Sequence, residues 1–302
     1  MQPLRDLARQ LLADGAASVV VGYEEGPLGV RPSFATTADE AAKLVFDHRA
    51  VQNLAAYLNP RRRALLPAGK AAIVVKPCDA AAVAGLLREQ QLRREDVVLI
   101  GMRCPGVTPR PDDAAPQGPQ DFADRCAACT ERVPHLADHV LGDVPAAEPV
   151  GAGIGAAGAV TRPVSRAERL AALDAMDPDA RWAWWSAEFA RCVRCHACRE
   201  VCPLCFCERC LADKTTPQWI ESSPHARGNV AWNISRALHL AGRCVGCGEC
   251  ERACPADIPL GLLNAKLAAV VAERFDYRAG DDPSVPAPIG TFRADDEQEF
   301  IR

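Results

Sequence analysis

Two segments of the chain, residues 192–203 (CVRCHACREVCP) and residues 244–255 (CVGCGECERACP), share one cysteine spacing. In each run, two residues separate the first three cysteines from one another, and a fourth cysteine follows after three more residues, directly before a proline. This spacing is typical of the runs that bind [4Fe-4S] clusters in bacterial two-cluster ferredoxins. The second half of the chain is therefore predicted to form a ferredoxin-like iron-sulfur domain.

The cysteine before each proline predicts a crossed set of ligands. Three closely spaced thiolates surround one cluster, and the fourth cysteine of the run is turned toward the other cluster. One cluster is then expected to be held by Cys192, Cys195, Cys198 and Cys254, and the other by Cys244, Cys247, Cys250 and Cys202. A pair of zinc ribbons is the alternative, but it fits poorly because tetrahedral zinc needs two cysteine pairs.

The composition is that of a globular protein with a cofactor. Of its 302 residues, 49% are apolar and 25% are charged, which disfavours disorder and allows one or two domains. A chain of this length can bury a core without disulfides, so its 15 cysteines indicate cofactor chemistry in a reducing cytoplasm. The charged N-terminus does not resemble a signal peptide, and no segment is long enough to span a membrane. A formal charge of -4 predicts no nucleic-acid surface, so small molecules and protein partners are expected.

Residues 1–144 are predicted to form an α/β domain around a parallel sheet. Apolar spacing at residues 4–12 and 38–58 indicates helices, and a β-branched strand at residues 18–23 leads into a hairpin turn at 24–27. Residues 71–100 read strand, helix, strand, which is typical of a parallel βαβ unit of about 30 residues.

The rest of the chain is predicted to divide into three parts. Residues 145–165 are expected to form a linker, and their G-x-G-x-x-G stretch at 153–158 lacks the flanking strand and helix of a dinucleotide site. Residues 166–275 are expected to form the iron-sulfur domain, with helices near its start and at its end. Residues 276–302 are a polar tail, expected to hang free or to lie on a partner.

Four cysteines of the first half form a second group. Cys78 and Cys104 each follow one of the two predicted parallel strands, so both should lie at the carboxyl edge of the sheet. Together with the pair Cys126 and Cys129, they are expected to hold a third [4Fe-4S] cluster. A zinc site and unligated buried thiols are the alternatives.

Three further cysteines, Cys205, Cys207 and Cys210, lie just beyond the first run. They are expected either to ligate a fourth cluster with a non-cysteine or borrowed ligand, or to hold a tight loop. Both interpretations are compatible with the spacing.

Three segments together resemble a known family: residues 76–79 (KPCD), residues 101–105 (GMRCP) and residues 188–210. They are similar to the beta subunits of deazaflavin (factor 420)-dependent hydrogenases and formate dehydrogenases, in the bacterial branch with a fused two-cluster ferredoxin segment. The resemblance implies an iron-sulfur flavoprotein that binds FAD, receives electrons from a catalytic subunit and passes them as hydride to a two-electron carrier. It makes Lys76 and Arg103 candidate partners of the flavin phosphate or isoalloxazine.

The resulting hypothesis is an oxidoreductase subunit that transfers electrons within a complex of hydrogenase, formate dehydrogenase or heterodisulfide-reductase-like type. A flavin would convert the single electrons of the clusters into pairs. No residue set in the sequence suggests a substrate-converting metal site, so that site is expected on a partner chain. The alternatives are a flavin-free one-electron relay and, less favoured, a zinc-dependent interaction protein.

Overall fold

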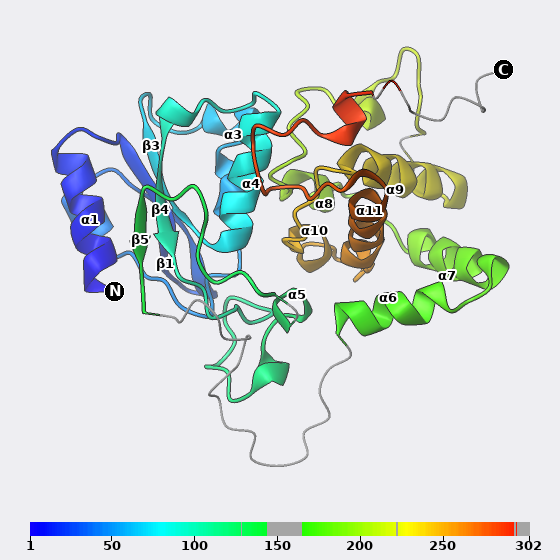
Figure 1. Ribbon diagram of the computed structural model, residues 1–302, viewed down its shortest axis with the longest axis horizontal. Helices are drawn as coiled ribbons and strands as arrows, with labels where there is room; N and C mark the ends of the chain where they lie inside the picture. The colour runs from blue at the N-terminus through cyan, green and yellow to red at the C-terminus, as the bar shows by residue number, and fades with distance from the viewer. Residues whose placement is uncertain (128, 144–164, 222, 293, 295–302) are drawn as a thin grey trace.

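The first half of the chain folds around a mixed β-sheet (Figure 1). The computed structural model describes residues 1–127, 129–143, 165–221, 223–292 and 294. Within them the strands are β1 (Val19–Gly26), β2 (Gly29–Ala35), β3 (Ala71–Val75), β4 (Val97–Met102) and β5 (His139–Leu141). The strand order is β2-β1-β3-β4-β5; β2 is antiparallel to β1, and all other neighbours are parallel. The predicted parallel sheet and hairpin are both present, and the hairpin adds an antiparallel edge strand.

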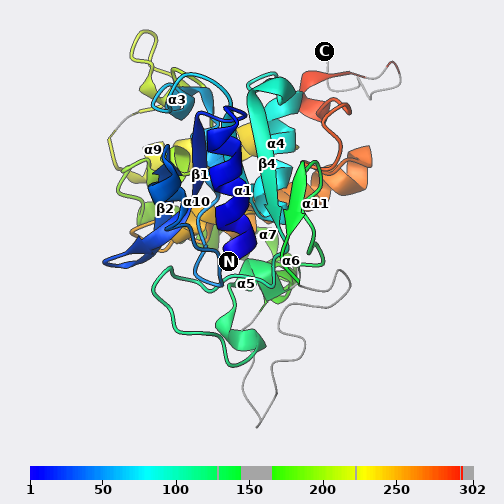
Figure 2. The same cartoon turned by 90° about the vertical axis from the view of Figure 1, so that its left-hand side faces the viewer.

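Helices cover both faces of this sheet. Figure 1 shows α1 (Gln2–Ala13) on one side and α4 (Pro77–Arg88) on the other, between the sheet and the second half of the chain. In Figure 2, α1 lies in front of the strands. Every residue of β3 is buried, because a strand that is covered on both faces packs apolar side chains in both directions. The strand, helix, strand prediction for residues 71–100 is confirmed.

The prediction of a single helix at residues 38–58 is wrong. Only α2 (Ala38–Ala41) and a 3₁₀ turn at Leu54–Tyr57 are helical in this range. The side chains of Asp47 and Asn53 accept hydrogen bonds from backbone amides two residues further on, at 2.8 and 3.1 Å, which favours turns over a continuous helix. The apolar residues at helical spacing are buried by an irregular segment instead.

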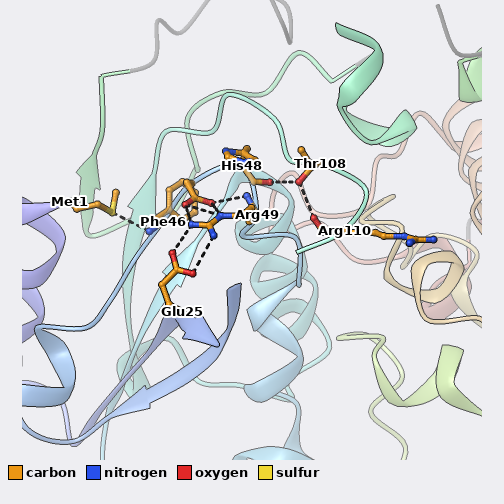
Figure 3. A network of polar contacts seen from close by, with 8 residues as sticks. Met1, Glu25, Phe46, His48, Arg49, Thr108 and Arg110 are labelled. Atoms are coloured by element: carbon orange, nitrogen blue, oxygen red, sulfur yellow. Dashed lines mark hydrogen bonds and ion pairs between the residues drawn. The ribbon is translucent and has the colours of Figure 1, made fainter. Parts of the chain in front are cut away.

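Polar contacts fix this irregular segment beside the sheet (Figure 3). The guanidinium of Arg49 bonds the carboxylates of Glu25 and Asp47, with shortest distances of 2.6 and 2.7 Å. The carbonyl oxygen of His48 accepts hydrogen bonds from the amide and the hydroxyl of Thr108, at 2.9 and 3.0 Å. The segment therefore also anchors the loop that follows β4, and that loop carries Cys104.

Short elements complete the first half. They are α3 (Pro60–Arg63), α5 (Asp124–Ala127) and 3₁₀ turns at Arg94–Asp96 and Pro119–Asp121.

The described part of the second half, from residue 165 onward, is helical and has no named strand. Its elements are α6 (Arg166–Asp174), α7 (Pro178–Ala190), α8 (Ala197–Glu200), α9 (Ala226–Leu240), α10 (Glu249–Arg252) and α11 (Leu260–Phe275), with 3₁₀ turns at Leu211–Asp213 and Pro288–Gly290. The helices predicted near residue 166 and at 260–275 are confirmed.

The two cysteine runs have the same backbone conformation. In the first run, Arg194 and His196 have φ values of 57° and 60°; at the equivalent positions of the second run, Gly246 and Gly248 have 70° and 73°. Each run then enters a four-residue helix, α8 or α10, that carries its third cysteine. Equal spacing thus produces two equal loops, which places the cysteines of both runs in equivalent geometry.

Side chains of the first half bind the loop that follows the first run. The Nδ2 atom of Asn59 donates hydrogen bonds to the carbonyl oxygens of Pro203 and Cys205, at 3.2 and 3.1 Å. Arg61 pairs with Glu200 at 3.0 Å. These contacts hold the first run against the α/β half through α3 and the turn before it.

Part of residues 276–292 packs against the same chain. Tyr277 is buried with Val271 and Ala287, and its ring lies 5.3 Å from the guanidinium carbon of Arg88 on α4. The expectation of a tail that hangs free or lies on a partner is therefore wrong at Tyr277 and Ala287, whereas most other residues up to 292 are exposed. The predicted linker and its glycine-rich stretch fall almost wholly on residues 144–164, outside the described residues. None of the described helices is long and apolar enough to cross a bilayer.

Candidate metal centre

One cavity is surrounded by three cysteines of the first run and the last cysteine of the second. Its wall includes Cys192, Cys195, Cys198 and Cys254, together with Trp232, and its volume is about 20 Å³. Burial raises the pKa of the Cys198 thiol to about 11, and the nearby thiols of Cys192 and Cys254 act in the same direction. The structure thus brings together the first of the two crossed quartets. We call this space the first cavity.

A second cavity is surrounded by the complementary set. Cys202, Cys244, Cys247 and Cys250 all line it, and its volume is also about 20 Å³. Burial raises the pKa of Cys244 to about 12 and that of Cys247 well above its usual value. The Nδ2 atom of Asn264 on α11 lies 3.6 Å from the Cys250 sulfur and donates to it. The second crossed quartet is therefore also assembled around one space.

The donor set of these two cavities fits iron-sulfur clusters. Each offers four thiols, one of which is buried (Cys198 in the first cavity, Cys250 in the second), and a bound metal removes the protons from thiols whose own pKa is high. In the described part of the chain, no three His, Cys, Asp or Glu side chains are arranged to hold a metal ion. A cubane keeps its ligands farther apart than a single ion does, so the two cavities are compatible with [4Fe-4S] clusters.

One face of α9 lies against the first run. Asn229, Trp232, Asn233 and Arg236 follow the helical spacing i, i+3, i+4, i+7, and all four are buried. Asn229 donates to the Cys192 carbonyl oxygen at 2.8 Å. These residues were not predicted from the sequence, although a polar stripe at helical spacing between two cysteine runs would have been the signal.

Arg236 is the buried cation of this stripe. It is 6% exposed, donates to the Cys198 carbonyl oxygen at 2.9 Å and lines the second cavity. Burial opposes its charge, but the thiols of Cys250, Cys205 and Cys202 outweigh that effect and raise the pKa of Arg236. Among the described residues, no carboxylate forms a salt bridge with Arg236. Its positive charge therefore faces cysteines.

The four cysteines of the first half are successive neighbours: Cys78 with Cys104, Cys104 with Cys126, and Cys126 with Cys129. Cys78 lies in the first turn of α4, Cys104 follows β4, and Cys126 lies in α5 with Cys129 just beyond it. Burial raises the pKa of Cys78, and Asp79 and then Cys104 add to the effect. Burial, followed by Cys126, raises the pKa of Cys104 to about 12. We call these four residues the sheet-edge quartet.

Arg125 lies between the sheet-edge quartet and the second run. Its guanidinium donates to the Val51 carbonyl oxygen at 3.3 Å, and its Cδ atom would be 2.8 Å from a Cβ atom at Gly248. Burial opposes its charge, but Cys126 and then Glu249 raise the pKa of Arg125. This residue was not predicted from the sequence, and it places a cation between two candidate cluster sites.

A third cavity contains Cys205, Cys207 and Cys210, and its volume is about 60 Å³. A hydrogen bond between the thiols of Cys205 and Cys202 lowers the pKa of Cys202 to about 6 and raises that of Cys205. The loop that carries these three cysteines therefore adjoins the second cavity.

The two candidate flavin residues are Lys76 and Arg103. Lys76 is 1% exposed; its ammonium donates to the Tyr23 hydroxyl and, at 2.7 Å, to the Gln52 carbonyl oxygen, and it pairs with Asp79 at 2.9 Å. All three donors of the ammonium thus have protein partners, so Lys76 does not fit a role in binding flavin phosphate. The Arg103 amide donates to the Leu141 carbonyl oxygen at 2.8 Å, which ties this residue to β5.

Comparison with known families agrees with the two cysteine runs. Residues 188–258 match the family model described as a 4Fe-4S dicluster domain. The match spans both runs and the three cysteines of the third cavity.

Two relatives carry names of the predicted class. The chain is 35% identical, over 103 residues, to the F420-dependent formate dehydrogenase subunit beta of Methanocaldococcus jannaschii; the match covers 34% of this chain and 26% of that protein. It is 23% identical, over 306 residues, to the F420-dependent formate dehydrogenase 1 subunit beta of Methanococcus maripaludis, covering 73% of this chain and 76% of that protein. The family named from the sequence is thus supported, and its bacterial branch stays a prediction.

Proposed function

We propose that this chain is the iron-sulfur electron-transfer subunit of an oxidoreductase complex of the formate dehydrogenase type. The observation that carries the proposal is the pair of cavities whose walls contain the two crossed cysteine quartets. In the proposal, each quartet holds one [4Fe-4S] cluster, which accepts and donates single electrons. Because Leu260 lines the first cavity and Gly261 lines the second, the two clusters would be close neighbours.

The sheet-edge quartet is proposed to hold a third [4Fe-4S] cluster. Arg125 supports this assignment, because its charge interacts with Cys126 and Cys78 of the quartet and also with Cys247 of the second run. A salt-bridge network continues this contact: Arg166 lies 3.2 Å from Asp124, beside Arg125, and 3.7 Å from Glu251, beside Cys250. The relay would then run from the ferredoxin-like half into the α/β half.

The catalytic site is proposed to lie on a partner subunit. The relatives are named as beta subunits of F420-dependent formate dehydrogenases, which implies a complex with at least one other chain. The formate dehydrogenase type is favoured over the hydrogenase and heterodisulfide-reductase-like types because both relatives carry that name. A cytoplasmic location is proposed from the cysteines, since all 15 are free thiols.

The flavin-free version of this relay is the one we favour. The resemblance implies FAD, but the ammonium of Lys76 is already bonded to Tyr23, Gln52 and Asp79. Conversion of single electrons into pairs would then take place on a partner. Under this version, protein purified with its clusters releases no flavin when it is denatured. Release of about one flavin per chain would restore the iron-sulfur flavoprotein interpretation.

The proposal is tested by metal analysis of the full chain purified without oxygen. Three clusters require about twelve irons and about twelve acid-labile sulfides per chain, at about four of each per cluster. Reduction with dithionite should produce the electron paramagnetic resonance (EPR) spectrum of reduced [4Fe-4S] clusters. Zinc in place of iron, with no acid-labile sulfide, would contradict the proposal and favour a zinc-dependent interaction protein.

A further inference from the structure

The third cavity has a wall unlike that of the other two. Cys205, Cys207 and Cys210 line it, and so does the imidazole-bearing residue His239 at the end of α9. Three thiols and one imidazole are four potential ligands for iron. The cysteines come from a loop that has no helix or strand until the turn at Leu211–Asp213.

We propose that Cys205, Cys207 and Cys210 bind a further [4Fe-4S] cluster in the third cavity, with His239 as the fourth ligand. This inference deepens the proposed function, because it rests on the same relay and adds one cluster to it. Neither crossed quartet uses these three thiols, and the sheet-edge quartet is complete without them.

The size of the cavity supports this assignment. Its volume is about 60 Å³, whereas the first and second cavities measure about 20 Å³ each. A space that exceeds both proposed cluster sites has room for a group of the same kind.

Positive charge around the cavity supports a negatively charged occupant. Its wall contains four arginines. Arg61 pairs with Glu200, Arg199 with Asp213 and Arg243 with Glu89, which leaves Arg236 as the cation of this wall with no carboxylate partner among the described residues. The guanidinium of Arg199 also lies near Cys210, whose thiol raises the pKa of Arg199. Three thiolates carry net negative charge, and nearby cations favour the thiolate form over the thiol. Arg236 in particular has no carboxylate salt bridge in the described structure, so its charge is available to the sulfur ligands.

Shared walls place this site within reach of the other two. Trp232 lines both the first and the third cavity, and Leu204, Arg236 and Leu240 line both the second and the third. One layer of side chains therefore separates the third cavity from each proposed ferredoxin-type cluster. A cluster there would exchange single electrons with its neighbours, one cluster being oxidised as the other is reduced.

The site lies near the surface. Cys207 and His239 are exposed, and Cys205 and Cys210 are partly buried. An iron at the Cys207 edge would be the part of the relay nearest to solvent. This position suits the entry or exit of electrons from a partner subunit.

The test compares iron and acid-labile sulfide in the full chain and in the variant with Cys207→Ala and Cys210→Ala, both purified without oxygen. The expected loss is about four irons and about four sulfides per chain. The EPR signals of the two ferredoxin-type clusters should persist. A matched control is Ser235→Ala, which changes another wall residue and should keep the full iron content. Unchanged iron in the double variant would overturn the inference, and so would the loss of about one zinc without iron.

Two single variants keep the test decisive if the double variant misfolds. Cys207→Ala changes an exposed side chain and should remove one EPR signal while the far-ultraviolet circular dichroism stays the same. His239→Gln should keep the iron but shift the g-values of that same signal; an unchanged spectrum would remove His239 as the ligand. If the wild-type chain holds clusters and Cys207→Ala loses none, only this inference fails. If the wild-type chain holds zinc and no iron, the proposed function fails as well.

Discussion

The guanidinium of Arg236 donates a hydrogen bond of 2.9 Å to the carbonyl oxygen of Cys198, and Arg236 also lines the cavity of the opposite cysteine quartet. One buried cation thus contacts the first cysteine run and also lines the cluster site that is formed mainly by the second cysteine run. A charge in this position stabilises the reduced form of a cluster, which is the more negative one. The helix α9 therefore affects both proposed clusters through a single side chain.

Replacing Arg236 by Met should lower the reduction potentials of both ferredoxin-type clusters. The loss of a buried positive charge disfavours the added electron, so we expect each reduction potential to fall by roughly 30–60 mV. A shift of this size changes the equilibrium constant for one-electron reduction by about tenfold or less. A redox titration followed by EPR measures both values. Arg236→Lys keeps the charge and serves as the control. Potentials equal to those of the wild type in the Met variant would show that the charge is screened from the clusters.

Replacing Asn59 by Ala should weaken the attachment of the first run to the α/β half. The variant loses two buried hydrogen bonds to the carbonyl oxygens of Pro203 and Cys205, which we expect to cost about 1–3 kcal/mol in the free energy of unfolding. Urea denaturation without oxygen measures the change. Asn59 also accepts a hydrogen bond from the Arg61 amide at 3.1 Å. Asn59→Asp keeps that acceptor, so a wild-type stability for this variant would mean that the Arg61 contact, and not the link to the first run, is what matters.

Replacing both Cys104 and Cys126 by Ser should remove the cluster of the sheet-edge quartet alone. Cys104 lies in the loop after β4 and Cys126 lies in α5, so the double variant removes two ligands that come from separate segments. We expect about four fewer irons per chain, with the EPR signals of the two ferredoxin-type clusters unchanged. Iron that stays at the wild-type level would favour unligated buried thiols. The loss of about one zinc would favour a zinc site.

Features that depend on local spacing could be predicted from the sequence. The spacing of the two runs is repeated in their backbone, down to the positive φ values at residues 194, 196, 246 and 248. The strands β3 and β4 were predicted because buried parallel strands are continuous apolar runs, and their direction correctly placed Cys78 and Cys104 at one edge.

Features that depend on tertiary contacts could not be predicted in the same way. The helix expected at residues 38–58 had the right apolar spacing, but the side chains of Asp47 and Asn53 bond nearby backbone amides and form turns. Lys76 stood in a family-like motif, yet its burial depends on Tyr23, more than fifty residues earlier in the sequence. Arg125 and Arg236 acquire their importance only from the cysteines that the fold brings beside them.

The most direct test of the crossed assignment compares the EPR spectra of four single variants of the full chain: Cys195→Ser, Cys247→Ser, Cys254→Ser and Cys202→Ser. The first two perturb one run each and so identify which signal belongs to which cluster. We predict that Cys254→Ser alters the same signal as Cys195→Ser, and that Cys202→Ser alters the same signal as Cys247→Ser. If Cys254→Ser instead alters the signal that Cys247→Ser alters, each run holds its own cluster and the crossed assignment is wrong.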